Sequence, residues 1–266
     1  MTKLFFFDID GTLIECNKGL YEISKTNRQS FDVLKEKGHD VFLATGRCKC
    51  FITDGVMNYP FSGYVTCNGG YVEYKGKALY KAIVPAKAIE ETIKLSKEHH
   101  FSFYFESNDF IYVLDRNEPR HVEFAKNWGM KDETIIDDFD PQEIEAYIGM
   151  IVINSKEDIP VLVETLSPYF DIQRHQTGYS FDLTLKGVSK AVGIKKLVEA
   201  LNKDMQDTIA FGDGYNDLSL IEYCGYGVAM ENAVDEVKER ANYITLSNND
   251  NGIAYCLKQL EEKGLI

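Results

Sequence analysis

The chain has 266 residues, 44% of them hydrophobic and 27% charged, and this composition is typical of a folded protein that can bury a full core. Its formal net charge of −13, with no basic run to offset it, argues against nucleic acid or an anionic membrane as a partner. No apolar run has the length of a membrane span, and the N-terminal residues lack a signal-peptide pattern, so we expect a cytoplasmic protein.

The opening stretch joins a strand to a pair of carboxylates. Leu4 to Phe7 are apolar without interruption, which predicts a short strand buried on both faces. Asp8 and Asp10 follow, and in extended chain residues two apart point to the same side. Burying ionised carboxylates is costly, so two of them in one space favour a bound cation or a shared proton. Gly11 permits a sharp turn after them.

The next strands end in the same manner. Asn27 to Lys37 has the apolar spacing of an amphipathic helix, and the strand Asp40 to Ala44 ends at Thr45-Gly46-Arg47. A third strand, Gly63 to Cys67, ends at Asn68-Gly69-Gly70. Polar residues at the carboxyl ends of successive strands predict a parallel sheet with a functional edge.

The middle of the chain changes from alternation to paired strands. Tyr71 to Tyr74 and Ala78 to Val84 flank a turn as in a hairpin. Helices and neighbouring strands then follow as an α+β module, which we place at residues 84–186. Its predicted elements are helices at Ala86 to His99, Pro119 to Trp128 and near Pro160, and strands at Phe101 to Glu106, Phe110 to Asp115, Tyr147 to Ile153, Tyr169 to Arg174 and Tyr179 to Leu185.

The last part returns to alternating strands and helices. A helix starting near Ser189 leads to the strand Thr208 to Phe211, which ends in the acidic loop Gly212 to Asp217. A short helix, the strand Gly225 to Met230, a helix through Val234 and Val237, the strand Tyr243 to Leu246 and a terminal helix complete the chain. We therefore predict an α/β protein: a discontinuous Rossmann-like parallel-sheet core at residues 1–83 and 187–266, and an inserted α+β cap at 84–186.

The polar clusters at these strand ends and helix starts each have an ordinary explanation. Thr45 could cap a helix, Lys190 could be a solvated lysine, and the loop with Asp213, Asn216 and Asp217 could be a plain turn. Together they supply carboxylates, a hydroxyl and a cation. That set meets the electrostatic needs of phosphoryl transfer, in which positioning and charge neutralisation dominate catalysis.

Their order resembles the four motifs of the haloacid dehalogenase superfamily. Asp8 to Thr12 resembles its first motif, Thr45-Gly46-Arg47 its second, Lys186 to Lys190 its third, and Gly212 to Asp217 its fourth. The insert after the third strand is similar to the α/β cap of the Cof-type subgroup, subfamily IIB. The resemblance covers essentially the whole chain. Two positions depart from the family pattern: Leu218-Ser219-Leu220 stands where many members carry a methionine, and Gly70 stands where alanine is common. Neither departure changes a charged residue.

The resemblance implies a Mg²⁺-dependent phosphatase acting on small phosphorylated metabolites. Asp8 would attack phosphorus to form an aspartyl-phosphate, and Asp10 would protonate the leaving group and then activate water. The implied sites are a metal site with Asp8, Asp10 through its carbonyl, and Asp213; a phosphate- and substrate-binding set with Thr45, Gly46, Arg47, Lys190 and Asn216; and a supporting Asp217.

Two alternatives stay open. The same core could belong to a phosphosugar mutase, which would pass the phosphoryl group to a second hydroxyl, or to a non-catalytic sensor of a phosphometabolite. Asp10 argues against an ATP-driven pump, whose leaving group needs no proton. Sugar phosphates and pyridoxal phosphate both fit as substrates, and the sequence does not distinguish them or set the oligomeric state.

Cysteines and histidines suggest no further chemistry. We read the five histidines as surface or cap residues. Cys48-x-Cys50 lacks the second ligand pair of a closed metal site. Without a secretory signal we expect reduced thiols at all six cysteines, namely Cys16, Cys48, Cys50, Cys67, Cys224 and Cys256.

Overall fold

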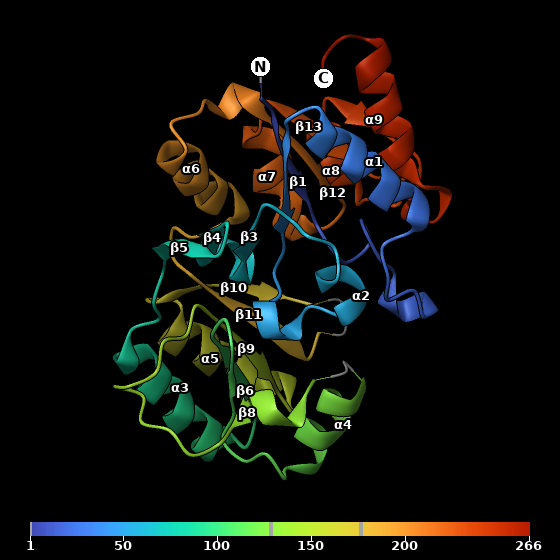
Figure 1. The fold of residues 1–266 in the computed structure, drawn as a ribbon. Helices are drawn as coiled ribbons and strands as arrows, with labels where there is room; N and C mark the ends of the chain where they lie inside the picture. The colour runs from blue at the N-terminus through green and yellow to red at the C-terminus, as the bar shows by residue number, and fades with distance from the viewer. Residues whose placement is uncertain (1, 128–129, 176–177) are drawn as a thin grey trace. The chain divides into compact units, whose positions relative to one another are not determined.

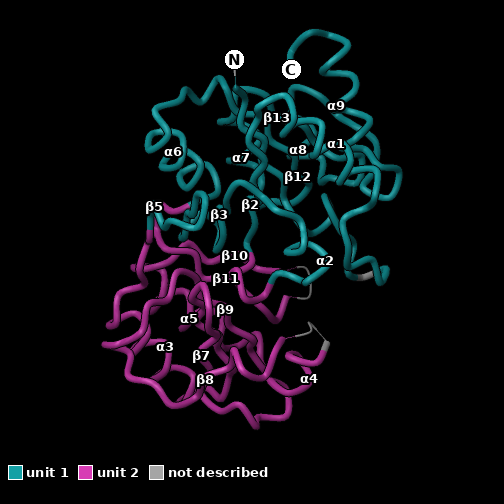
Figure 2. Tube along the Cα trace, in the orientation of Figure 1, with its two compact units in different colours: residues 1–46, 52–80, 189–266 teal, residues 47–51, 81–188 magenta. Residues whose placement is uncertain are grey.

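The computed structural model describes residues 2–127, 130–175 and 178–266. The chain divides into two compact units (Figure 2). The first contains residues 1–46, 52–80 and 189–266, and the second contains residues 47–51 and 81–188. The α/β class predicted from the sequence is confirmed, with a parallel sheet in the first unit. No described helix is both long and apolar enough to cross a membrane.

The sheet of the first unit has the strand order β14-β13-β12-β1-β2-β3-β4-β5. The strands from β14 to β3 run parallel, and β4 returns antiparallel beside β3. The bounds are β1 Leu4–Phe7, β2 Asp40–Ala44, β3 Gly63–Thr66, β4 Tyr71–Tyr74, β5 Lys77–Lys81, β12 Thr208–Gly212, β13 Tyr226–Ala229 and β14 Tyr243–Ile244.

Helices cover both faces of this sheet, which explains the uninterrupted apolar run of β1. Phe5 and Phe7 pack into one hydrophobic cluster with residues of α1 (Lys25–Glu36) and α9 (Gly252–Glu262). Leu4 and Phe6 pack into another with residues of α6 (Lys190–Ala200) and α7 (Leu218–Tyr223). Figure 1 shows α6 on one side of the strands and α1 and α9 on the other. The remaining helices of the unit are α2 Asp54–Met57 and α8 Asp235–Arg240.

Local signals set the ends of α1. Its first residue is Lys25, two residues before the predicted start, because Ser24 is the N-cap and its Oγ accepts from the Asn27 backbone N–H at 3.2 Å. Such a cap contributes about 1 kcal/mol. Gly38 follows the helix with φ of 84°, a left-handed conformation that glycine adopts without strain.

Parallel register brings distant motifs to one edge of the sheet. Phe7, the last residue of β1, pairs with Phe211 of β12 and with Leu43 of β2. The residues after these strands therefore emerge together at their carboxyl ends, where α/β folds place their functional sites.

The second unit contains a six-stranded sheet with the order β10-β11-β9-β6-β7-β8. Among the described residues of this sheet, β7 pairs with β8 in parallel and the other neighbouring strands pair antiparallel. The strand bounds are β6 Ser102–Glu106, β7 Ile111–Tyr112, β8 Ile135–Ile136, β9 Ile148–Val152, β10 Phe170–Arg174 and β11 Ser180–Leu185.

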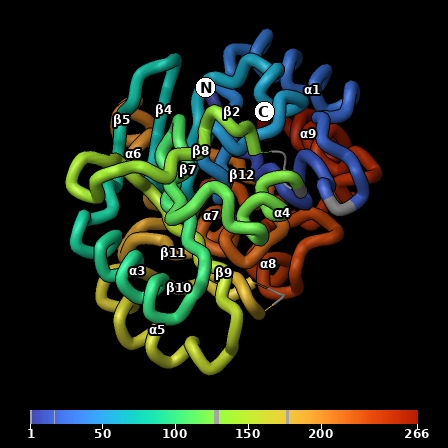
Figure 3. Tube along the Cα trace, turned by 90° about the horizontal axis from the view of Figure 1, so that it is seen from below, coloured from blue at the N-terminus to red at the C-terminus, as the bar shows by residue number. Residues whose placement is uncertain are grey.

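Two helices of the second unit, α3 (Ala86–His99) and α5 (Ile159–Leu166), pack against each other, as Figure 3 also shows. They share a hydrophobic cluster with alternate residues of the strands, such as Phe103 and Phe105 of β6. A third helix, α4, spans Pro119–Asn127. Its predicted end at Trp128 lies outside the described residues.

The strands at one end of this sheet differ most from the sequence prediction. β7 has two residues where Phe110 to Asp115 were expected, and β8 was not predicted. The Val113 N–H still donates to the Ile136 carbonyl at 2.9 Å, and a local turn follows, in which the Asn117 backbone N–H bonds the Asp115 side chain at 2.8 Å. Two-residue strands are too short for a periodic pattern to reveal them.

Candidate active site

A fully buried lysine forms the centre of the candidate site. Lys190 is 0% exposed, and its Nζ donates to Asp8 Oδ1 at 2.6 Å and to Asp217 Oδ1 at 2.6 Å. Burial alone would lower the pKa of Lys190, but the charges of Asp217 and Asp8 outweigh it and raise that pKa above its ordinary value. The ammonium is therefore cationic and joins two carboxylates that are far apart in sequence.

Close backbone packing positions this lysine. It is the first residue of α6, whose N-cap Ser189 accepts from the Val192 N–H at 3.3 Å. A Cβ on Gly193 would lie 2.8 Å from the Gly69 Cα, and a Cβ on Gly69 would overlap the Ser189 carbonyl. Only residues without a side chain allow the start of α6 to approach the segment after β3 this closely.

A third carboxylate of the site, Asp213, comes from the end of β12. Asp213 Oδ1 accepts from the Thr12 hydroxyl at 2.7 Å, between residues 201 positions apart. Burial and the nearby charge of Asp217 raise the pKa of Asp213 to about 7. Gly11 has φ of 79°, and a Cβ there would overlap the Asp213 carboxylate. The turn after Asp10 is therefore shaped around Asp213.

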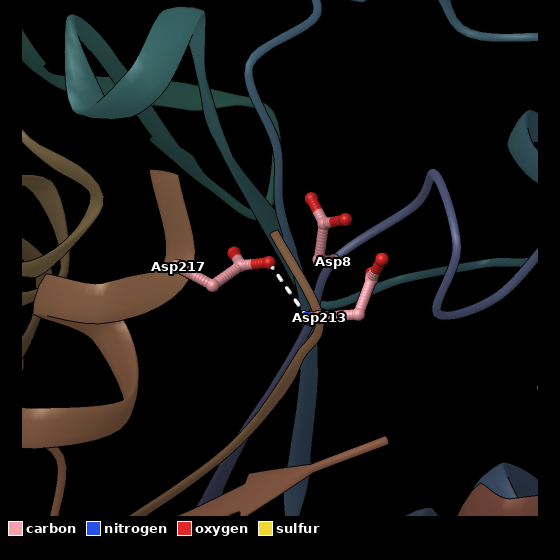
Figure 4. A group of neighbouring side chains, drawn as sticks. All are labelled: Asp8, Asp213 and Asp217. Atoms are coloured by element: carbon pink, nitrogen blue, oxygen red, sulfur yellow. Dashed lines mark hydrogen bonds between the residues drawn. The ribbon is translucent and has the colours of Figure 1, made fainter. Parts of the chain in front are cut away.

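Asp8, Asp213 and Asp217 form a compact acidic group. One carboxylate oxygen of each lies within 4.8 Å of the others, and Figure 4 shows Asp8 between the other two. Asp217 Oδ2 accepts from the backbone N–H groups of Asp213 at 2.9 Å and Gly214 at 3.0 Å. Both oxygens of Asp217 thus have protein donors, since Oδ1 bonds Lys190. Asp8 and Asp213 are left as the group's candidate ligands for a cation.

The charge balance of the group fits a divalent cation. Burial and the charge of Asp217 raise the pKa of Asp8 well above its ordinary value, although Lys190 acts in the opposite direction. Within the described residues, Lys190 is the cation that pairs with Asp8, and Asp213 forms no ion pair. Negative charge therefore exceeds positive charge here, and oxygen ligands of this kind suit Mg²⁺.

Asp10, the second aspartate of the first motif, is not part of this acidic group. The Asp10 side chain is exposed, whereas Asp8 is 5% exposed. The charge of Asp10 nevertheless raises the pKa of both Asp8 and Asp213, which places it within electrostatic reach of both. The third side chain of the acidic group is Asp217, whereas the sequence assigned Asp10 to the metal through its backbone carbonyl.

The polar residues of the neighbouring loops gather close to one another. Thr45 is buried at the end of β2, and its carbonyl accepts from the Asn68 N–H at 3.1 Å. Asn216 Nδ2 donates to Asn68 Oδ1 at 3.2 Å, and a Cβ on Gly46 would contact both asparagine side chains. The three predicted residues Thr45, Gly46 and Asn216 are therefore joined through Asn68.

Arg47 belongs to the second unit, whereas Thr45 and Gly46 belong to the first. Its Nη1 donates to the Phe51 carbonyl at 3.1 Å, and its guanidinium lies over the Phe51 ring at 5.1 Å. The sequence motif thus spans the division between the two units.

Two residues of this site were absent from the sequence-based set. Thr12 holds Asp213, and Asn68 links the loops that carry Thr45 and Asn216. Thr12 lies within the first motif, where the sequence predicts that its hydroxyl bonds local backbone; in the structure it bonds Asp213 instead. For Asn68 the signal was the Asn-Gly-Gly run at a strand end, where asparagine tolerates the left-handed conformation that it adopts here, with φ of 51°.

Comparison with known proteins gives consistent matches along the chain. The family model of haloacid dehalogenase-like hydrolases matches residues 5–257. The Bacillus subtilis protein YkrA is 34% identical over 97% of this chain and 98% of its own. The 5-amino-6-(5-phospho-D-ribitylamino)uracil phosphatase YitU, also from B. subtilis, is 27% identical over 96% of each chain. A solved structure of the subclass IIB sugar phosphatase BT4131 superposes with a TM-score of 0.82 at 26% identity, covering 100% of both chains.

Proposed function

The chain belongs to the haloacid dehalogenase-like hydrolase family and is a phosphatase, and we propose that it hydrolyses small phosphate monoesters with Mg²⁺ through an aspartyl-phosphate on Asp8. The observation that carries the proposal is the buried contact of Lys190 with Asp8 at 2.6 Å, beside Asp213. A nucleophilic carboxylate, a fixed cation and a carboxylate for the metal are the parts that phosphoryl transfer needs.

In the proposed first step, an Asp8 carboxylate oxygen attacks phosphorus and the bond to the leaving alkoxide breaks. Asp10 donates the proton that the alkoxide needs, because an alkoxide is a poor leaving group. In the second step Asp10 takes a proton from water, which attacks phosphorus and releases Asp8 and inorganic phosphate. The exposure of the Asp10 side chain supports this role, since it must exchange protons with substrate and water.

The other residues would hold charge in place. Asp8, Asp213 and the Asp10 carbonyl would hold the metal ion, which when bound would neutralise charge on the transferring phosphoryl group. We assign phosphoryl and substrate contacts to Lys190, Thr45, Gly46, Arg47 and Asn216. Asp217 supports the site by fixing Lys190 and the Asp213 backbone.

The substrate we propose is a small phosphorylated metabolite, a sugar phosphate or a similar ester. The names of YitU and BT4131 support this class, since one describes a phosphoribityl compound and the other a sugar phosphatase. We further propose that residues 84–186 act as the cap and the remainder as the catalytic core. A cytoplasmic location belongs to the same proposal.

The test is phosphate release from a panel of phosphate monoesters, with Mg²⁺ and with a chelator. We expect wild type to release phosphate only with the metal, and Asp8→Asn to lose turnover on the order of a thousandfold or more while still binding substrate. Asp204→Asn is a matched control, since it makes the same substitution in the first unit at an N-cap away from the acidic group.

Unchanged turnover in Asp8→Asn would refute the mechanism. An isomeric sugar phosphate formed without phosphate release would identify a mutase instead. Binding without turnover of any ester would indicate a sensor.

A further inference from the structure

The sequence pair Cys48-x-Cys50 is brought together in the second unit. The two sulfur atoms are 3.3 Å apart, with Cys48 fully buried and Cys50 partly exposed. The chain between them turns tightly, because the Phe51 N–H donates to the Cys48 carbonyl at 3.0 Å. The Cys50 N–H donates to the Asn108 carbonyl at 3.0 Å, which fixes this turn to the rest of the unit.

This sulfur pair lies against a buried carboxylate. Glu106, the last residue of β6, is 6% exposed, and its carboxylate accepts hydrogen bonds from the side chain and the backbone of Cys48. Burial raises the pKa of Glu106 to about 7. A carboxylate with such a pKa, in contact with a thiol, is suited to take up the thiol proton.

We propose that Cys48 and Cys50 form a reversible dithiol–disulfide site, in which Glu106 is the base that deprotonates Cys48. A hydroperoxide is the oxidant. It oxidises the more accessible Cys50 to a sulfenic acid, with release of water or an alcohol. The Cys48 sulfur then attacks the Cys50 sulfur: its proton passes to Glu106, the S–O bond breaks, and the departing hydroxide takes the proton to leave as water. Overall two thiol hydrogens are lost and the peroxide is reduced.

The disulfide should be easily reversed. A bond between residues two positions apart closes a very short loop, so it gains little from chain entropy. The small ring is strained, and strained disulfides are the readily reduced ones. Excess thiol reductant should therefore reopen it.

Closing the ring would also move Arg47. The Arg47 guanidinium bonds the Phe51 carbonyl and lies over the Phe51 ring. Arg47 directly precedes Cys48 in the sequence and Phe51 directly follows Cys50, so this contact spans the cysteine pair. A change in the turn would displace the guanidinium and alter KM for a phosphate ester. This effect on KM rests on the proposed function, whereas disulfide formation does not.

The experiment treats the reduced full-length protein with hydrogen peroxide, alkylates the remaining thiols and maps peptides without reduction. We expect wild type to lose two hydrogens, with the bond between Cys48 and Cys50 and the other four of the six cysteines alkylated. Dithiothreitol should restore all six. Cys50→Ser should not form the bond, and Cys16→Ser, a substitution of another partly exposed cysteine, should behave as wild type.

A second variant tests the base. Glu106→Gln keeps a hydrogen-bond acceptor for Cys48 but cannot take its proton, so disulfide formation should slow by a factor on the order of ten or more. An equal rate in Glu106→Gln would overturn the role of Glu106. Thiols that stay reduced, a bond to a different cysteine, or a sulfinic acid on Cys50 without a bond would each overturn the site. If the mass change occurs in a protein without phosphatase activity, the proposed function fails and the disulfide site stands.

Discussion

Replacing Lys190 by methionine removes the buried ammonium and keeps a long, flexible side chain in its place. At 2.6 Å and an effective dielectric constant of about 20, each contact of Lys190 with a carboxylate amounts to about 6 kcal/mol of Coulomb attraction. The desolvation of each ion, several kcal/mol, offsets much of this. Removing one partner of a buried ion pair typically costs about 3–5 kcal/mol, because the remaining charges are stranded. We therefore expect Lys190→Met to lower the free energy of unfolding by about 3–5 kcal/mol, a large part of the about 5–15 kcal/mol that is typical of a folded protein. The variant should also lose phosphatase activity.

Urea unfolding, followed by circular dichroism at neutral pH, measures this loss. Lys196→Met is the matched control on the same helix, since Lys196 has a side chain 46% exposed and a long contact of 3.7 Å with Glu199. It should stay within about 0.5 kcal/mol of wild type. Adding Asp217→Asn to Lys190→Met removes one stranded carboxylate, and should recover part of the stability without recovering activity. If the free energy of unfolding of Lys190→Met lies within about 1 kcal/mol of the wild-type value, then Lys190 does not balance the charges of Asp8 and Asp217 as we describe.

The other predictions concern the turn after Asp10 and the second unit. Gly11→Ala should lower the free energy of unfolding by about 1–2 kcal/mol because of its positive φ, and should also lower activity because the new Cβ would overlap Asp213. Gly38→Ala is the control: it has φ of 84° and open space around it, so it should lose stability but keep its activity. His175 donates to Asp182 at 3.0 Å, and this hydrogen bond raises the pKa of His175 above its ordinary value. The stabilisation is therefore complete below about pH 6.5 and is lost as pH rises through the raised pKa, so His175→Gln should differ from wild type in urea unfolding near pH 6 and converge with it near pH 9. A difference that grows with pH would contradict this assignment.

The sequence predicts most elements because their packing demands are local. β2 and α3 have the bounds that the pattern predicted, and β1 reads as an apolar run because helices cover both of its faces. β8 gives no such signal, since two residues cannot show a period. Its pairing with β7 depends on contacts made by the folded second unit.

The candidate site could be predicted in part for the same reason. Strand ends locate Asp8, Thr45 and Asp213, because parallel register brings carboxyl ends to one edge. The sequence does not reveal which oxygen bonds which donor. The partners of Thr12 and Asn68 therefore appear only in three dimensions.

The distinct roles of the carboxylates follow from where their oxygens find donors. Asp217 is fully buried, and its oxygens accept from Lys190 and from the backbone N–H groups of Asp213 and Gly214. Binding a metal would cost Asp217 these hydrogen bonds, and an unsatisfied buried donor costs about 1–3 kcal/mol. Asp213 accepts one such hydrogen bond, from Thr12 Oγ1, and burial together with the charge of Asp217 raises its pKa despite this contact. Proximity alone groups three aspartates, but the hydrogen bonds assign Asp217 to holding the loop and favour Asp8 and Asp213 as the pair that binds a cation.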